Sequence, residues 1–263
     1  MRPDGESATP VPSVPGMSNR VKILIGVAVV VVVAVGGGLW WWLGDDAPDA
    51  VSLDAAVDQV EGDEPAATST PAGNAGPSAI DGTWTVDTET GEFDFDSATG
   101  TFAGYRVEEE LAGIGANTAV GRTGDVTGSV TIDGSTVDEA QFEVDLTTLA
   151  SDEGLRDGQA QGALETSLFP TTTFVLTEPI DLPGEAASGE AVSLTAMGDL
   201  TLHGVTRSVE FPLEAQLVED TVVLVGSVEV IFADYDVEVP TTPIALSVDQ
   251  EGILELQILL TRS

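Results

Sequence analysis

Polar and apolar residues alternate with a period of two through most of the chain beyond residue 80. Clear runs lie at 93–96, 126–132, 142–146 and 253–260. A strand with one buried face produces this period, and glycine-containing breaks such as Asp133-Gly134-Ser135 separate the runs. Short strands joined by tight turns predict a mainly β domain, an antiparallel sheet that closes into a barrel or packs as a sandwich.

The parity of these strands assigns one set of side chains to the interior. Parity identifies the buried face, but it does not separate a packed core from the wall of a cavity. The interior set comprises Phe93, Phe95, Val130, Ile132, Phe142, Val144, Leu146, Phe174, Leu176, Leu200, Leu202, Phe211, Leu254, Leu256 and Ile258.

Residues 151–168 depart from the alternation, because they contain no β-branched run. They predict one short helix with Asp152 as its cap and with Leu155, Ala163 and Leu164 facing inward. Glycines within the segment lower its helix propensity, so packing must hold the helix in place.

A long uncharged apolar stretch occupies residues 23–43. As a helix rising about 1.5 Å per residue it would be roughly 31 Å long, close to the ~30 Å hydrocarbon thickness of a bilayer. Arg20 and Lys22 precede the stretch, and Asp45 and Asp46 follow it. Positive charge stays on the cytoplasmic side, so we expect a single-pass plasma-membrane protein with a cytoplasmic tail at 1–22 and its C-terminal domain outside.

Two other interpretations of residues 23–43 remain. A cleaved secretory signal has a shorter apolar stretch, followed by small residues at the cleavage site; here three tryptophans, residues 40–42, stand in that place. A buried core helix would carry a polar face, which this stretch lacks.

Residues 44–80 are rich in Ala, Asp, Pro, Thr, Ser and Gly and show no periodicity. This composition predicts an acidic flexible linker with a root-mean-square reach of roughly 33 Å. The folded domain is expected at 81–263.

Charge excludes one class of function. The chain has 45 Asp and Glu against 8 Lys and Arg, a formal net charge of -37. Such a chain repels phosphate backbones, so no nucleic-acid partner is expected. There is no cysteine and one histidine, which excludes disulfides, thiolate catalysis and Cys- or His-rich metal sites.

Four local patterns follow one another from residue 84 onward. They are Trp84-Thr85-Val86-Asp87, Leu155-Arg156-Asp157-Gly158, the 169–174 stretch FPTTTF, and the 198–206 stretch GDLTLHGVT. With these patterns in this order, the domain resembles the YceI-like family of extracytoplasmic polyisoprenoid-binding proteins. The last pattern is the most specific. Two residues after the Arg-Asp pair, where the family often has histidine, this chain has Gln159.

The resemblance implies an eight-stranded, lipocalin-like antiparallel barrel with a helix near one end and an elongated apolar cavity for an isoprenoid chain. Arg106 and Arg156 are the candidates for binding a phosphate or carboxylate head group, since guanidinium binds such groups in a bidentate way. The candidate lipid-binding residues are Phe93, Phe95, Phe142, Val144, Leu146, Phe174, Leu176, Leu200, Leu202, Phe211 and Leu256.

The sequence contains few features that support an enzymatic function. Asp94 and Asp96 begin a calcium-loop-like spacing, but Ala98 and Thr99 break it. Paired carboxylates could serve a glycoside hydrolase, yet so acidic a domain produces such pairs by chance. His203 precedes Gly204 at an expected hairpin, where its ring would face solvent.

The sequence therefore predicts a membrane-anchored extracytoplasmic binding protein that holds a polyisoprenoid or another amphiphilic lipid. No catalytic site, metal or cofactor is expected. The alternative is a ligand-free barrel displayed at the cell surface as an interaction or structural module. A homodimer stays open.

Overall fold

The structure, a computed structural model, describes residues 47–63, 80–91, 93–240 and 245–263. The chain divides into two units, Met1–Gly44 and Asp45–Ser263, and every described residue belongs to the second. The expected tail at 1–22 and membrane span at 23–43 lie outside the described residues. Within the described ranges, no helix has both the length and the apolar character needed to cross a bilayer.

The described residues form a large β-sheet with two α-helices, α2 (Leu53–Asp63) and α3 (Gly154–Ala163). Short 3-10 turns occur at η2 (Leu146–Thr148), η3 (Gly184–Ser188) and η4 (Phe232–Tyr235). The strands are β1 (Gly82–Asp87), β2 (Phe102–Leu111), β3 (Gly115–Thr123), β4 (Val126–Asp133), β5 (Thr136–Asp145), β6 (Thr171–Leu176), β7 (Ile180–Asp181), β8 (Val192–Leu202), β9 (Val205–Val218), β10 (Thr221–Ile231), β11 (Ala245–Val248) and β12 (Glu251–Arg262).

Eight of the strands close into a barrel. They pair in the order β1-β4-β5-β6-β8-β9-β10-β12, and β12 pairs again with β1. All these pairings are antiparallel. The closed antiparallel barrel that the family resemblance implied is therefore confirmed.

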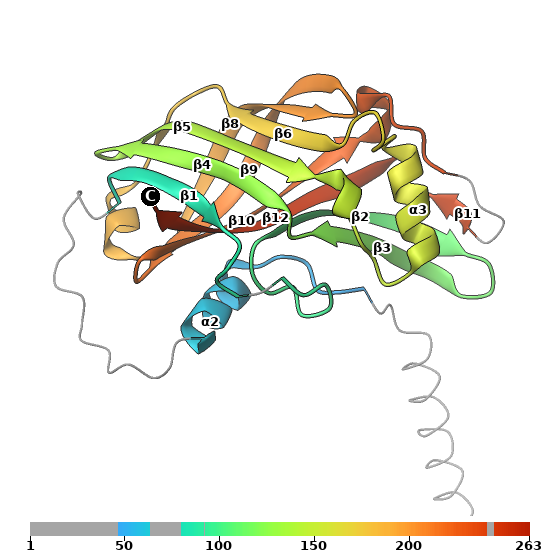
Figure 1. Cartoon of the computed structure of the whole chain (residues 1–263), viewed down its shortest axis with the longest axis horizontal. Coiled ribbons are helices and arrows are strands. Elements are labelled where there is room, and N and C mark those ends of the chain that lie inside the picture. The colour runs from blue at the N-terminus through green and yellow to red at the C-terminus, as the bar shows by residue number, and fades with distance from the viewer. Residues whose placement is uncertain (1–46, 64–79, 92, 241–244) are drawn as a thin grey trace, which may run out of the picture. The chain divides into compact units, whose positions relative to one another are not determined.

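The last strand, β12, has a different neighbour at each of its ends. Its residues from Leu259 to Arg262 pair with β1, whereas those from Ile253 to Gln257 pair with β2. Strand β2 in turn pairs with β3 and β11. Figure 1 shows these three strands at the end of the molecule where α3 lies, so the two ends of the barrel are built differently.

The interior face follows the expected parity along most of the barrel. On β12, Leu254, Leu256, Ile258 and Leu260 belong to the apolar clusters, whereas Glu255 and Gln257 point to the other side and are buried under a second layer. The two faces of this strand therefore differ in chemistry although both are buried.

The expected strand at 93–96 is wrong. These residues lie in the loop between β1 and β2, where the Asp94 carboxylate accepts a hydrogen bond from the backbone N–H of Ser97 at 2.8 Å. Phe93 packs outside the barrel, with its ring 6.2 Å from that of Phe102. The alternation at this place reflects a turn that aspartate stabilises, so Phe93 and Phe95 are not on a barrel strand.

Helix α2 lies inside the range that we expected to be a flexible linker, so the expectation is wrong for residues 53–63. Leu53, Ala56 and Val57 are buried, and Val60 packs beside them, against β9, β10 and β12. Their i, i+3, i+4, i+7 spacing makes one apolar stripe on a short helix. The acidic residues Asp54 and Asp58 are exposed, which is why the segment resembles a solvated linker in composition.

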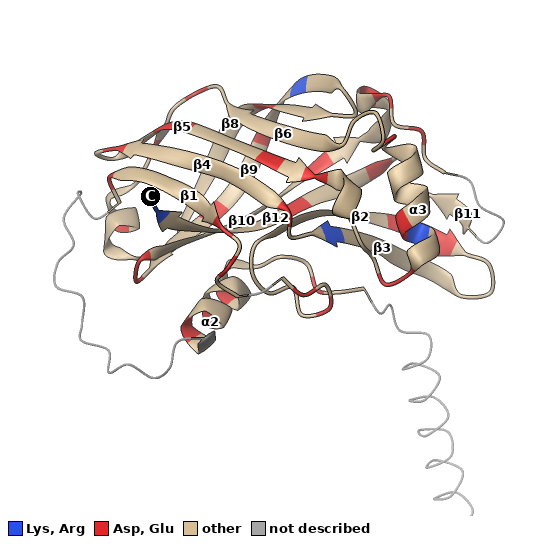
Figure 2. Ribbon diagram, viewed as in Figure 1, with Lys and Arg blue, Asp and Glu red and all other residues tan. Residues whose placement is uncertain are grey.

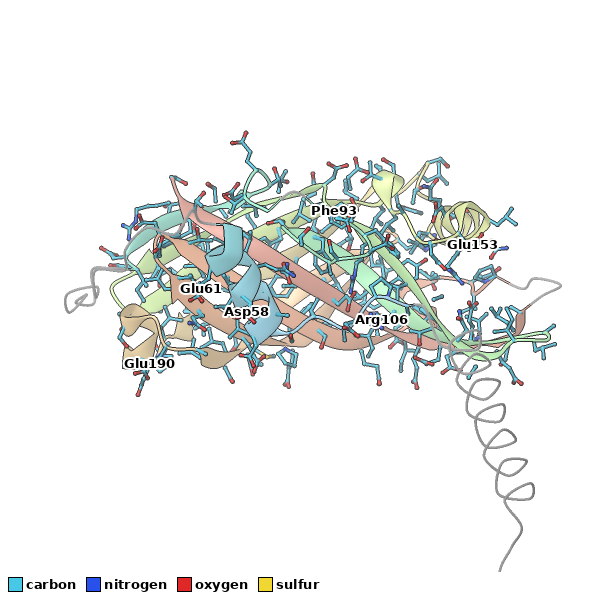
Figure 3. The ribbon with its side chains drawn as sticks, turned by 90° about the horizontal axis from the view of Figure 1, so that it is seen from below. Asp58, Glu61, Phe93, Arg106, Glu153 and Glu190 are labelled. Atoms are coloured by element: carbon cyan, nitrogen blue, oxygen red, sulfur yellow. The ribbon has the colours of Figure 1, made fainter. Side chains whose placement is uncertain are left out.

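A buried ion pair lies under the chain that leads into α2. The Arg122 side chain, 0% exposed, contacts the Glu255 carboxylate at 2.6 Å and also donates to the backbone carbonyl of Asp49 at 2.8 Å. Arg122 reaches Glu255 across Gly104, where a Cβ would lie 2.8 Å from the Arg122 Cγ. Only glycine leaves room for this crossing. Figure 3 views this face of the barrel.

The cap of helix α3 lies one residue later than expected. Glu153 occupies the cap position without a capping hydrogen bond from its side chain, and Asp152 instead forms an ion pair with Arg156. Leu155 is 78% exposed, so its expected inward orientation is wrong, whereas Leu164 packs against an apolar cluster.

Removing one partner of the buried ion pair should destabilise the fold strongly. Arg122→Met removes the closest cation from the buried Glu255 and leaves only Arg106, 3.8 Å from its carboxylate, so we expect the free energy of unfolding to fall by about 3–5 kcal/mol. Arg122→Met/Glu255→Leu removes both charges and should be more stable than the single variant. Urea denaturation followed by tryptophan fluorescence measures both. A double variant no more stable than Arg122→Met would contradict this account.

Candidate functional site: an apolar lumen with a polar mouth

The barrel encloses a cavity of about 130 Å³ near its middle, which we call the central cavity. Glu255 is the one charged residue among the described residues that line it, and its carboxylate is bound by Arg122. The residues of the sequence-predicted interior set that line this cavity are Phe142, Val144, Leu146, Phe174, Leu200, Leu202, Phe211, Leu254, Leu256 and Ile258.

A second cavity of about 100 Å³, the far cavity, lies toward the end of the barrel that β1 closes. Its lining includes Trp84, Val130, Ile132 and Leu176, of which the last three were predicted to face inward. The indole of Trp84 donates to the backbone carbonyl of Ile80 at 2.9 Å, so its polar atom is satisfied although the residue is 2% exposed.

Aromatic rings separate the central cavity from the far cavity. Phe142 and Phe174 line both cavities, and the Phe174 ring lies 6.0 Å from the Phe211 ring in an edge-on arrangement. A Cβ on Gly198 would lie 2.3 Å from the Phe174 Cζ, so this strand position must lack a side chain. We call these three phenylalanines the aromatic waist.

A third cavity of about 120 Å³, the mouth pocket, lies between α3 and strands β2 and β3. It shares Tyr105 and Leu164 with the central cavity, so the two adjoin. Its lining includes Glu109, Arg156 and Gln159, so it holds an ion pair and an amide where the two barrel cavities are lined mostly by apolar residues. The three cavities therefore follow one another from an apolar interior to a polar opening.

Arg156 is held in the mouth pocket by two carboxylates. Its guanidinium contacts Glu109 at 3.0 Å and forms a second ion pair with Asp152. Burial by itself would lower the pKa of Arg156, but the negative charge of Asp152 and the hydrogen bond that Arg156 donates to Glu109 outweigh it and raise the pKa. Asn117 also donates to Glu109, at 2.8 Å, so the group is fixed from both sides.

Tyr105 stands at the junction of the mouth pocket and the central cavity. Burial raises the pKa of Tyr105 to about 12, and the nearby positive charge of Arg156 opposes this only in part. The hydroxyl therefore stays protonated at neutral pH and can donate a hydrogen bond.

The other head-group candidate, Arg106, does not face the lumen. Its guanidinium donates to the backbone carbonyl of Pro48 at 2.7 Å and lies 3.8 Å from the Glu255 carboxylate. Figure 3 shows Arg106 beside the chain that precedes α2. Its expected place at the ligand is wrong, because Ile253 pairs with Arg106 and fixes it on the outer face of β2. Phe93 and Phe95 likewise line none of the three cavities.

His203 does not face solvent as expected. Its Nδ1 lies 3.1 Å from the backbone carbonyl of Tyr235, and its Nε2 lies 3.0 Å from the Glu165 carboxylate. The ring also packs edge-on against Phe169, 4.7 Å away. His203 thus ties the β8–β9 turn to the chain that follows α3. Among the described residues, no three His, Cys, Asp or Glu side chains gather as metal ligands would.

Sequence reasoning missed several residues of the lumen. Leu213 and Leu224 line both barrel cavities, and Tyr105 lines the central cavity. The signal for Leu213 was present, since it lies two residues after Phe211 on the same strand face. Tyr105 gave no such signal, because the glutamates at 108–110 obscure the period of β2.

Asp and Glu residues are distributed over the strands, turns and helices of the described part of the chain (Figure 2), whereas the two inner cavities are lined mostly by apolar residues. Most of the negative charge therefore lies away from the inner cavities, and the residues that could bind a ligand line the lumen and the mouth pocket.

The chain is similar to one known family and to several solved structures. The family model described as YceI-like domain matches residues 84–260. A polyisoprenoid binding domain from Saccharophagus degradans, implicated in plant cell wall breakdown, is 16% identical, with a TM-score of 0.49 over 62% of this chain and 98% of that one. BcnA from Burkholderia cenocepacia is 17% identical, with a TM-score of 0.48 over 60% of this chain and 94% of that one. No curated protein matches the sequence significantly.

The titration of the two tyrosines tests the burial of the mouth. Burial raises the pKa of both Tyr105 and Tyr235. The folded state then holds these protons more tightly than the unfolded state, so this part of the stability is complete below about pH 10 and declines toward pH 12. Tyrosinate absorbance should show a step near pH 12 that Tyr105→Phe removes. A step at the ordinary value that Tyr105→Phe removes would mean that water reaches the hydroxyl.

Proposed function

Because this chain belongs to the family of YceI-like domains, whose model matches residues 84–260, we propose that its barrel binds a polyisoprenoid or another amphiphilic lipid. The observation that carries the proposal is the apolar lumen, with cavities of about 130 and about 100 Å³ on the two sides of the aromatic waist. An apolar cavity of ~150 Å³ in a protein core stays dry and takes up an apolar molecule. A hydrocarbon chain is the ligand that such a lining suits.

The energetics favour exchange of the lipid with a membrane. About 15 buried CH₂ equivalents gain roughly 12 kcal/mol on entering the lumen, at ~0.8 kcal/mol each. The same chain loses nearly as much when it leaves a bilayer, so the transfer is close to balanced. A carrier or a sensor needs this reversibility.

The aromatic waist affects how long a hydrocarbon chain the lumen can hold. A chain that extends from the central cavity into the far cavity must pass Phe142 and Phe174, which line both. Rotation of these rings would join the two cavities into one longer channel. A linear isoprenoid is narrow enough to use such a channel once the rings turn.

The mouth pocket favours an uncharged head group. Arg156 is its one cation among the described lining residues, and Glu109 and Asp152 already bind it. A phosphate would have to compete with both carboxylates and would meet their repulsion. A hydroxyl or carbonyl head group needs only a neutral hydrogen-bonding partner, which Tyr105 and Gln159 supply.

We further propose that the protein is not an enzyme and that residues 23–43 anchor it in the plasma membrane, with the barrel on the outer side. The uncharged stretch and its flanking charges support the anchor. An anchored barrel stays close to the membrane from which an amphiphile would come.

The rival function, a ligand-free module displayed on the surface, predicts a barrel filled by its own side chains. Packed protein interiors contain few voids larger than a water molecule. Two cavities of about 100 Å³ or more in one small barrel favour the binding function.

Filling the lumen should displace the lipid. Ala103 faces the central cavity, and Ala103→Phe would occupy part of it at a cost of about 1–3 kcal/mol in stability. Val175→Phe adds a ring on the outer face of β6, where Val175 is 47% exposed, and serves as the matched control. Mass spectrometry of lipid extracted from each purified protein should find much less lipid only with Ala103→Phe. Equal lipid in both variants, or none in the unaltered protein, would contradict the proposed function.

The head-group preference can be tested by releasing Arg156. We expect the unaltered protein to bind a polyprenol at least as tightly as the corresponding polyprenyl phosphate. Glu109→Gln removes a carboxylate from Arg156 and should raise the affinity for the phosphate selectively, whereas Asn117→Ala, which removes only the amide donor to Glu109, should not. Fluorescent-lipid displacement measures both. Strong phosphate preference in the unaltered protein, abolished by Arg156→Gln, would show that the head group is anionic.

A further inference from the structure

The chain enters the described structure on the outer face of β2, the strand whose opposite face lines the mouth pocket. Arg106 and Arg122 hold the backbone carbonyls of Pro48 and Asp49. Arg106 lies between Tyr105 and Val107 on β2, and both of these neighbours line the mouth pocket. From there the chain continues into α2, whose apolar stripe is buried against β9, β10 and β12.

This docking leaves little chain between the barrel and the proposed anchor. Four peptide units separate Leu43, the last residue of the apolar stretch, from Ala47. Even fully extended they span at most about 14 Å. A linker free over residues 44–80 would reach roughly 33 Å. An anchor at 23–43 would therefore hold the barrel close to the membrane.

Three large apolar side chains are exposed around the end of β2. Ile114 is 61% exposed, Leu155 is 78% exposed and Leu246 is 65% exposed. We call these three residues the apolar rim.

Contacts with the last residues of β2 bring the rim together. The backbone N–H of Ile114 bonds to the carbonyl of Leu111, and Ala245, the neighbour of Leu246, pairs with Leu111 in the sheet. Leu155 adjoins Arg156, which binds Glu109. Figure 1 shows the β2–β3 turn, α3 and β11 at the same end of the molecule.

We propose that the apolar rim is a membrane-contact surface, and that the docked segment 47–63 holds the barrel with this rim against the lipid bilayer. The inference rests on the proposed lipid binding and adds the route by which lipid enters. Single exposed apolar residues are ordinary, but a group of them marks an interaction site. Here Arg156 and Ala245, the sequence neighbours of Leu155 and Leu246, line the pocket through which a lipid would pass.

The charged residues around the apolar rim indicate which kind of lipid surface the rim can contact. Exposed carboxylates of Glu108, Glu110, Asp152 and Glu153 stand around the rim. They repel an anionic surface, so the rim suits a bilayer of zwitterionic lipid. An apolar side chain can enter the interface of such a bilayer while the carboxylates stay in the head-group water.

The cysteine-free chain allows a direct test. The full chain is reconstituted in phosphatidylcholine vesicles, with single substitutions Ile114→Cys, Leu155→Cys or Leu246→Cys that carry an environment-sensitive fluorophore. Ser135→Cys, in the exposed β4–β5 turn, is the matched control. We expect a blue-shifted emission at the rim positions and quenching by quencher-labelled lipid several-fold stronger than at Ser135.

A further variant tests the docked segment. Val57→Asp places a charge in the buried stripe of α2 and should reduce the quenching at Ile114→Cys, whereas Asp58→Asn on the exposed side should not. Vesicles with added phosphatidylglycerol should also reduce the quenching.

Equal quenching at the rim and at Ser135 would overturn the proposed orientation. Lipid extracted from the same unlabelled protein reports separately on the lumen. If lipid is extracted but the rim positions are not quenched, the membrane-contact proposal alone is refuted. If the rim positions are quenched but no lipid can be extracted, the proposed lipid-binding function is refuted instead.

Discussion

The structure depends on how β12 pairs along its two edges. One edge lies against β10 for its full length, and the other is divided between β1 and β2. Pairing with β1 closes the ring, so no strand of the ring is left with an open edge at that end. Pairing with β2 brings in β3 and β11, and thereby builds the pocket that α3 borders. The closed ring at the β1 end of the barrel and the polar mouth pocket at the α3 end both result from this division.

The two faces of β12 carry two kinds of buried chemistry. Inward, Leu254 and Leu256 contribute to an apolar lumen that has room for a ligand. Outward, Glu255 and Gln257 are buried as well, and their polar contacts join β12 to the segments that cover it. Glu255 binds Arg122, and Gln257 donates to the backbone carbonyls of Ala98 and Gly100. The layer that covers this face therefore fastens the entering chain and pairs the charge of Glu255 with Arg122.

The two-residue alternation in the sequence correctly predicted which side chains of the barrel strands face inward. The sequence-based prediction failed where a local contact determines the position of a residue. The inward parity of residues such as Phe142, Phe174 and Leu256 was recoverable, because a closed sheet requires one apolar face on every strand. The position of Phe93 could not be predicted, because the four residues of this aspartate-stabilised turn alternate between apolar and polar as the residues of a strand do. Helix α2 was missed because its stripe is short and lies in an acidic segment. Arg106 was misplaced because nothing in the sequence shows which face of β2 it takes until the register with β12 is known.

A crystal structure of the protein purified with its own lipid would test the central claim most directly. The account predicts one elongated density that begins near Tyr105, runs through the central cavity and passes the aromatic waist, with the rings of Phe142 and Phe174 turned aside. Cavities that are empty or hold only water, between rings in the positions described above, would contradict it.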